Sequence, residues 1–233
     1  MKKANTLNEK KFRLLPEFSR FPLLAAVVFN MLVYVATKPL TSRLEHHDIT
    51  MAIDGHIPFF APFIVFYFLA FVQWVVCYVL IARDSREVCY KYLSAEMIGK
   101  FITLLFFVLY PTTMTRADVV GTDFFSSVVR WIYMIDSPYN LFPSLHCFAS
   151  WVCFRGCAAS KKLPKWFKIS NLILSLLVFA STVLIKQHVV IDIIGGVAVY
   201  EFALLIAKVF KTERIFEKLE QKRLAAKAAS CKK

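Results

Sequence analysis

The chain has 233 residues, of which 58% are hydrophobic and 15% are aromatic, including 23 Phe. This composition is too apolar for an ordinary soluble domain and excludes a soluble enzyme of typical surface polarity. The net charge of +13 comes mostly from Lys and Arg clusters that flank apolar runs. Such clusters favour contact with anionic lipid headgroups, and we expect no nucleic-acid partner.

Six apolar segments follow one another along the chain, and we interpret each as a transmembrane helix. About 20 apolar residues, at about 1.5 Å each, cross the hydrocarbon core of a bilayer. The first segment lacks a convincing signal-peptide cleavage site and is expected to be retained. The six segments are expected near residues 21–37, 57–82, 96–112, 141–159, 168–186 and 188–207.

The distribution of basic residues predicts the orientation of these helices. Of the 29 Lys and Arg, 23 lie in residues 1–20, 83–91, 155–168 and 208–233. The positive-inside rule therefore predicts that both termini are cytoplasmic. The predicted fold class is an all-α integral membrane protein with six transmembrane helices, the last four of which form a four-helix core.

The expected domain organisation follows from the same pattern. A basic cytoplasmic N-terminus precedes the membrane domain, and a basic tail, interpreted as an amphipathic helix on the membrane surface, follows it. The expected boundaries are 1–20, 21–209 with the core at about 94–209, and 210–233.

Polar side chains that are unusual in a membrane protein gather at the outer ends of the last four helices. Each alone has a structural explanation, such as a bond to a backbone carbonyl or an interfacial anchor, but their common depth indicates a functional site. They are Arg116 after the third helix, Ser144 and His146 at the start of the fourth, Lys186 at the end of the fifth, and His188 and Asp192 at the start of the sixth.

The residue types in this cluster predict phosphate chemistry. His188 and Asp192 are four residues apart, so on a helix they would share a face and the carboxylate would orient the imidazole. A second histidine, His146, allows one ring to attack as a nucleophile while the other transfers a proton. Cations beside a helix N-terminus bind anions, above all phosphate. No metal-ligand spacing accompanies the cluster, so we expect metal-independent chemistry without a cofactor.

A second group of polar residues lies in the first outer loop. A metal site there is conceivable, but two adjacent histidines do not easily face one ion, and we prefer a polar loop near the lipid headgroups. The residues are His46, His47, Asp48, Asp54 and His56.

The outer cluster resembles the signatures of the type 2 phosphatidic acid phosphatase superfamily, which are Lys-x6-Arg-Pro, Pro-Ser-Gly-His and Ser-Arg-x5-His-x3-Asp. The second signature corresponds to Pro143-Ser144-Leu145-His146, and the third to Ser181 and Thr182 followed by His188 and Asp192. The resemblance covers roughly residues 100–200.

Two cations of these signatures are missing from the chain. Leu109 stands where the first signature has its lysine, and Thr182 replaces the arginine of the third. Lys186 could supply one lost charge if the helix breaks near Gln187. Lys100 lies sixteen helical residues before Arg116, roughly 24 Å away, which is too far to substitute.

The resemblance implies a role for each matching residue. His188 would attack phosphorus and form a phosphohistidine, Asp192 would orient it, and His146 would protonate the leaving alcohol and then activate the acceptor. The phosphoryl oxygens would be bound by Arg116 and Ser144, with Lys186, Ser181 and Tyr110 as further candidates.

We therefore predict a metal-independent lipid phosphatase that acts on a lipid phosphate or diphosphate at the non-cytoplasmic face. One alternative is a lipid phosphotransferase, because the Pro-Ser-Leu-His variant is similar to the inositol-phosphorylceramide-synthase-like branch. Another is an inactive relative that binds lipid phosphates. A transporter or channel would need polar residues through the full membrane depth, whereas these gather at one edge.

Overall fold

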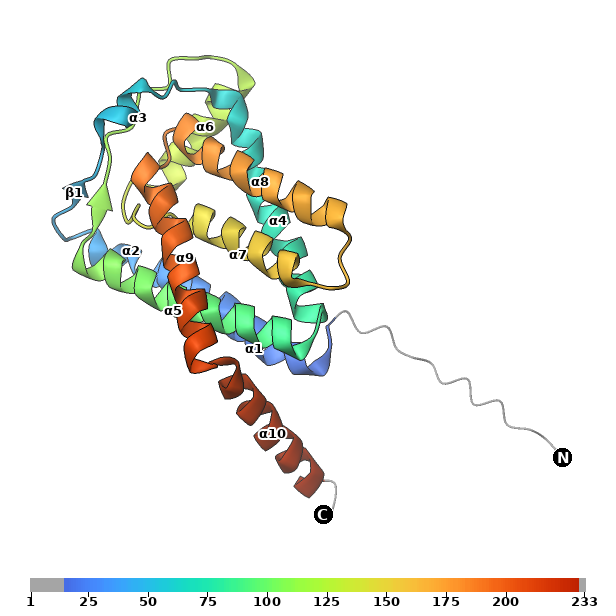
Figure 1. Ribbon diagram of the computed structural model, residues 1–233. Coiled ribbons are helices and arrows are strands. Elements are labelled where there is room, and N and C mark those ends of the chain that lie inside the picture. The colour runs from blue at the N-terminus through green and yellow to red at the C-terminus, as the bar shows by residue number, and fades with distance from the viewer. Residues whose placement is uncertain (1–14, 231–233) are drawn as a thin grey trace.

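The computed structural model describes residues 15–230 and consists mostly of helices (Figure 1), so the predicted all-α fold is confirmed. Two short strands, β1 (His47–Asp48) and β2 (Thr112–Thr113), pair in parallel. Parts of the predicted N-terminal and C-terminal basic segments, residues 1–14 and 231–233, lie outside the described residues. The α-helices are α1 (Glu17–Met31), α2 (Lys38–Thr41), α3 (Ala52–His56), α4 (Ile64–Arg83), α5 (Arg86–Leu109), α6 (Phe124–Ile135), α7 (Leu145–Ala159), α8 (Lys165–Leu184), α9 (Val190–Phe210) and α10 (Glu213–Ser230).

Five helical stretches are long and apolar enough to cross a membrane, and they coincide with five of the six predicted segments. A π-helix, Leu32–Ala36, joins α1 to α2, and a 3-10 turn, Ala61–Phe63, precedes α4. The chain is therefore a multi-pass membrane protein. The stretches are Glu17–Thr41, Ala61–Arg83, Arg86–Leu109, Lys165–Leu184 and Val190–Phe210.

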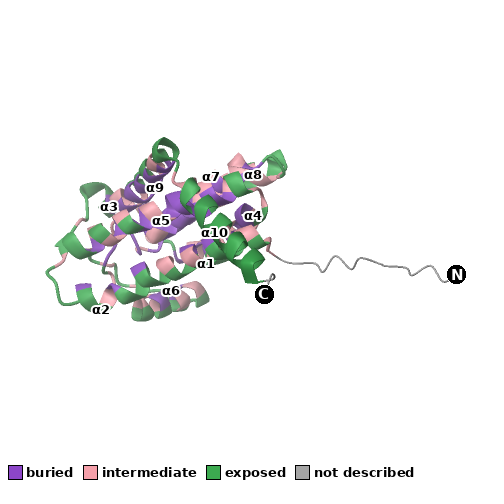
Figure 2. Ribbon diagram, turned by 90° about the horizontal axis from the view of Figure 1, so that it is seen from below, coloured by how far each residue is buried: buried purple, intermediate pink, exposed green. Residues whose placement is uncertain are grey.

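The outer faces of these helices carry exposed apolar side chains, as the green parts of the ribbons show in Figure 2. Val75 on α4 is 68% exposed, Phe101 on α5 is 52% exposed and Phe202 on α9 is 56% exposed. In water such faces would be unfavourable, whereas lipid tails match them without a desolvation cost.

The predicted segment 141–159 forms a shorter helix than expected. α7 has 15 residues, which corresponds to roughly 22 Å and is less than the ~30 Å hydrocarbon core. It packs against α4, α5, α8 and α9 and lies at the centre of the bundle (Figure 1). Phe148 and Val152 on α7 are fully buried. The apolar helix α6 (Phe124–Ile135) was not expected from the sequence.

A close approach between α7 and α9 aligns the first turns of the two helices. A Cβ atom on Gly196 of α9 would lie 2.8 Å from the main-chain oxygen of Ser144 and 3.0 Å from the main-chain nitrogen of Phe148. The main-chain nitrogen of Ser144 also donates to the main-chain oxygen of Asp192. Only glycine leaves room for this contact, which holds the start of α7 against the first turns of α9.

Thr112 organises the loops at this end of the bundle. Its hydroxyl accepts from the main-chain nitrogens of Leu141 and Phe142, and its main-chain oxygen accepts from Asn140. The segment after α5 is thereby tied to the segment that precedes α7. His47 pairs with Thr112 across the two strands, which fixes the first outer loop to the same place.

The opposite end of the bundle holds the basic loops. The Ser160 hydroxyl donates to the Asp84 carboxylate, so the loop after α4 contacts the loop after α7. Arg86 forms a bidentate ion pair with Glu220 of α10, and Tyr90 donates to the same carboxylate at 2.8 Å. These contacts place α10 beside the start of α5, at the same end as the loops.

We expect Gly196→Ala to lower the thermal unfolding temperature of the protein in detergent. The added methyl group would collide with the main chain of α7, and overpacking of this kind costs roughly 1–3 kcal/mol. Gly55→Ala is the matched control, because a Cβ atom there meets nothing within 4 Å. Equal unfolding temperatures for the two variants would contradict the tight α7–α9 contact.

Candidate active site

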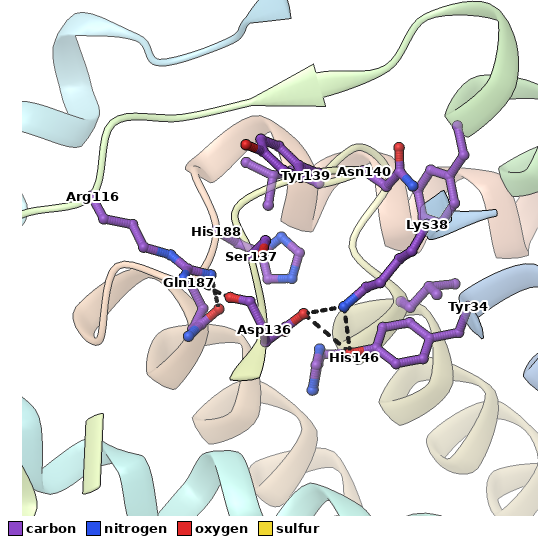
Figure 3. A pocket seen from close by; sticks show the side chains of 13 residues that line it. Tyr34, Lys38, Arg116, Asp136, Ser137, Tyr139, Asn140, His146, Gln187 and His188 are labelled. Atoms are coloured by element: carbon purple, nitrogen blue, oxygen red, sulfur yellow. Dashed lines mark hydrogen bonds and ion pairs between the residues drawn. The ribbon is translucent and has the colours of Figure 1, made fainter. Parts of the chain in front are cut away.

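A narrow pocket opens at the end of the bundle where α7 and α9 begin (Figure 3). It contains about 30 Å³ of free space, enough to hold at least one water molecule. Its lining residues come from well-separated segments of the chain: Tyr34, Lys38, Phe107, Arg116, Asp136, Ser137, Tyr139, Asn140, Leu141, Leu145, His146, Gln187 and His188.

His188 and Asp192 form the predicted pair, but through a helix cap rather than along a helix face. Lys186 adopts a left-handed conformation with φ 51°, and α9 begins only at Val190, so His188 precedes the helix. The Asp192 carboxylate turns back to accept from the main-chain nitrogen of Val189 at 3.1 Å and from Nδ1 of His188 at 3.0 Å. Both acceptor contacts use the same carboxylate oxygen.

This cap determines which nitrogen of His188 is able to react. The Asp192 side chain is completely buried and that of His188 is 10% exposed. With Nδ1–H donated to the carboxylate, the other ring nitrogen, Nε2, keeps its lone pair. Because His188 lines the pocket, Nε2 is a suitable nucleophile for a ligand bound there.

His146 lies in the first turn of α7, opposite His188. The centroids of the two imidazole rings are 5.9 Å apart. Tyr67 stacks against His146 at 4.4 Å and Trp74 contacts it at 5.3 Å. Its Nε2 atom is buried and has no hydrogen-bond partner within the described part of the chain. A buried, unpartnered imidazole nitrogen beside a nucleophile is well placed for proton transfer.

Arg116 reaches the pocket from the loop after β2. Its guanidinium lies 4.5 Å over the Tyr133 ring and donates at 2.6 Å to the main-chain oxygen of Asp136 and at 2.6 Å to the Gln187 side chain. The planar guanidinium is thus fixed beside the residue that precedes His188. A fixed guanidinium suits the recognition of phosphoryl oxygens.

The pocket brings His188, His146 and Arg116 together, with Asp192 behind His188. The other four predicted site residues contact different groups and do not line the pocket. Ser144 caps α7 by accepting from Cys147, and Ser181 donates to the main-chain oxygen of Val178. Their roles in binding phosphate stay predictions.

Lys186 and Tyr110 are the remaining two. The Lys186 ammonium donates to the main-chain oxygens of Asp54 and Ile57, at 2.9 and 2.6 Å. Tyr110 stacks on His47 with centroids 4.3 Å apart. The expected break near Gln187 is present, but it directs the Lys186 side chain towards the loop around α3.

Several pocket residues were not identified from the sequence, chiefly Lys38, Asp136 and Gln187. Lys38 forms an ion pair of 2.6 Å with Asp136, and Tyr34 donates to the same carboxylate at 3.1 Å. One signal was present in the sequence, because Lys38 is one of the few basic residues on the predicted outer side.

The polar residues of the first outer loop point to different partners. His46 stacks on Tyr139, His47 stacks on Tyr110, and Asp54 accepts from the main-chain nitrogens of Met51 and Val190. Within residues 15–230, no group of three His, Cys, Asp or Glu is arranged to hold a metal ion.

A comparison with protein families matches residues 41–206 to the model of the PAP2 superfamily. The chain belongs to the PAP2 superfamily. No curated protein and no solved structure matches it. Membership of the PAP2 superfamily supports phosphatase- or phosphotransferase-type activity for this chain. The match covers both histidines of the pocket, Arg116 and Asp192.

We expect Asp192→Asn to lower kcat for phosphoryl transfer by about 10²–10⁴-fold, because the amide does not hold His188 in the reactive tautomer. Steady-state kinetics on the purified variant would measure this loss. Asp48→Asn is the control, since Asp48 is an exposed carboxylate that accepts from Thr50 outside the pocket. An Asp192→Asn variant with wild-type kcat would contradict the orienting role of the carboxylate.

Proposed function

We propose that this PAP2 protein is a metal-independent lipid phosphatase that removes phosphate from a lipid phosphate or diphosphate. The observation that carries the proposal is the His188–Asp192 pair. The carboxylate holds Nδ1 of the ring at 3.0 Å, which leaves Nε2 reactive in a pocket that also holds His146 and Arg116.

The first step joins His188 to the phosphorus atom. Nε2 of His188 attacks, a P–N bond forms, and the P–O bond to the lipid breaks. His146 gives a proton to the leaving oxygen, so the lipid alcohol departs neutral. Arg116 stabilises the negative charge that spreads over the phosphoryl oxygens in the transition state.

The second step releases the phosphate. The neutral His146 takes a proton from water, the water oxygen attacks phosphorus, and the P–N bond to His188 breaks. Inorganic phosphate leaves and both imidazoles return to their starting states. Throughout both steps, Nδ1 of His188 keeps its proton and donates it in a hydrogen bond to the Asp192 carboxylate.

We further propose that the pocket faces the non-cytoplasmic side. The basic loops and α10 lie at the end of the bundle opposite the pocket (Figure 1). The positive-inside rule favours a cytoplasmic location for that end, where anionic headgroups would meet the Lys and Arg residues. A membrane lipid would then reach the pocket from the outer leaflet.

Transfer of a phospho-headgroup to an alcohol is the second candidate function. The Pro-Ser-Leu-His variant supports it, because this variant is similar to that of a transferase-rich branch of the superfamily. The pocket also contains the Asp136 carboxylate and the Asn140 amide, groups that hydrogen-bond the hydroxyls of a polyol acceptor. In both reactions the oxygen atom of the acceptor, water or alcohol, attacks the phosphorus atom of the phosphohistidine.

We expect the purified protein to release phosphate from at least one member of a panel of lipid phosphates with a chelator present, and His188→Ala to abolish release. Labelled substrate should give an acid-labile, alkali-stable phosphoenzyme in the wild type alone. Glycerol or inositol in the same assay distinguishes the second candidate, because transfer of the phosphoryl group yields a phosphomonoester of that alcohol in place of free phosphate.

His56→Ala is the matched control, because its exposed ring contacts the main-chain oxygen of Ala52 away from the pocket. Full turnover by His188→Ala would contradict the role of His188 as the nucleophile. Absence of either product from the wild-type protein would favour an inactive relative that binds lipid phosphates.

We expect the effect of His146→Ala to depend on the leaving group. A lipid alkoxide needs a proton as it leaves, so turnover of a lipid phosphate should fall by about 10²–10⁴-fold. A nitrophenolate leaves without protonation, so phosphoenzyme formation from nitrophenyl phosphate should fall much less. Burst-phase kinetics with both substrates would measure the difference, and equal losses would contradict a general-acid role.

A further inference from the structure

The pocket needs cations to bind a phosphoryl group, and the positions suggested by the family signatures do not supply them. Thr182 is buried and donates to the main-chain oxygen of Phe179, and Leu109 is apolar. Lys186 binds main-chain oxygens near α3. Lys100 is buried within the bundle and donates to Asn30 at 2.5 Å. None of these four residues lines the pocket.

Lys38 supplies a cation from outside the catalytic helices. It is the first residue of α2, one residue after the end of the π-helix, and its ammonium enters the pocket beside His146 (Figure 3). Position 38 precedes the residues 41–206 that match the PAP2 superfamily. Lys38 therefore lies outside the matched family region.

The Lys38 ammonium is held by an anion already present in the pocket. Its Nζ atom lies 2.6 Å from Oδ1 of Asp136 and 3.2 Å from the Tyr34 hydroxyl. Burial opposes ionisation of Asp136, but the hydrogen bond and charge of Lys38 hold the pKa of this carboxyl below its usual value. Asp136 is thus negative at neutral pH, and Lys38 neutralises it.

Arg116 and Lys38 approach Asp136 from opposite sides in Figure 3. Arg116 contacts the main-chain oxygen of Asp136, whereas Lys38 contacts its carboxylate. Asp136 therefore lies between the Arg116 guanidinium and the Lys38 ammonium in the pocket that also contains His146 and His188. The Lys38 ammonium is occupied by the Asp136 carboxylate, so a phosphoryl group that binds Lys38 requires these side chains to move.

We propose that Lys38 is a phosphate-binding residue of this site, whose ammonium exchanges the Asp136 carboxylate for a phosphoryl oxygen of the substrate. The exchange replaces one anionic oxygen with another, and the Tyr34 hydroxyl, 3.1 Å from Oδ1, keeps a hydrogen bond to Asp136. Arg116 and Lys38 then bind the phosphoryl group from two sides. This inference rests on the proposed function and adds a residue from α2 to the site.

We expect Lys38→Met to weaken binding of inorganic phosphate and to raise KM for the lipid phosphate, each by roughly 10- to 100-fold, because a charge-assisted hydrogen bond is lost. Lys38→Arg should retain most of both. Titration calorimetry with inorganic phosphate measures binding without turnover, and steady-state kinetics separate KM from kcat.

Asp136→Asn distinguishes phosphate binding from a purely structural ion pair. Both substitutions break the Lys38–Asp136 pair, so a structural role predicts similar losses in the two variants. The exchange instead predicts that Asp136→Asn binds phosphate as well as or more tightly than the wild type, because it removes the competing anion. Equal losses in Lys38→Met and Asp136→Asn, or no change in Lys38→Met, would overturn the proposal.

Two further variants complete the test. Lys38→Gln, which can still donate to Asp136 without a charge, replaces Lys38→Met if the latter does not fold. Arg43→Met is the control for loss of a positive charge at the same end, since Arg43 is exposed and outside the pocket. If phosphate binding depends on Lys38 but no lipid phosphate is turned over, the role of Lys38 is supported and the proposed phosphatase activity is contradicted. If turnover is unaffected by Lys38→Met, the phosphatase activity is supported and the role of Lys38 is contradicted.

Discussion

The arrangement of the site depends on the contacts of Asp192. Its carboxylate caps α9 at Val189 and orients His188, while its main-chain oxygen accepts from the main-chain nitrogen of Ser144 at the start of α7. One residue thus links the two helix starts beside which His146 and His188 lie. Because the carboxylate is completely buried, these bonds are shielded from water and hold the imidazole more strongly than exposed ones would.

Packing inside the bundle supports this geometry. Gly196 lets the backbone of α9 approach the first turn of α7, and α7 is enclosed by four longer helices. Lipid surrounds the outer faces of those helices and provides little driving force for their association, so close backbone packing and buried polar contacts hold them together. The bond from Gln73 to Asn171, which joins α4 to α8, is one such buried contact.

The rim of the pocket is built differently from its base. The base consists of helix starts with fixed side chains, whereas the rim consists of loops tied together through Thr112 and of the Lys38–Asp136 pair. Lys38 and Asp136 are both partly exposed at 32% and 21%, so water screens their attraction and its contribution to stability is small. A pair of this kind separates more readily than the buried His188–Asp192 pair.

The sequence by itself determined the apolar segments, the end of the bundle where polar residues gather, and the pairing of His188 with Asp192. These features depend on composition or on contacts within five residues of each other. Even there the sequence suggested a helix face where the structure has a helix cap, because spacing does not reveal that Lys186 takes a left-handed conformation.

Tertiary structure alone decided the rest. Lys38 and Asp136 are 98 residues apart, and no local pattern relates them, because their contact depends on how α2 packs beside the loop after α6. The same holds for Lys186, whose charge suggested a role in the pocket but whose ammonium is bound by the main chain near α3. The spacing of residues determines which groups share a turn, whereas helix packing determines which distant groups meet.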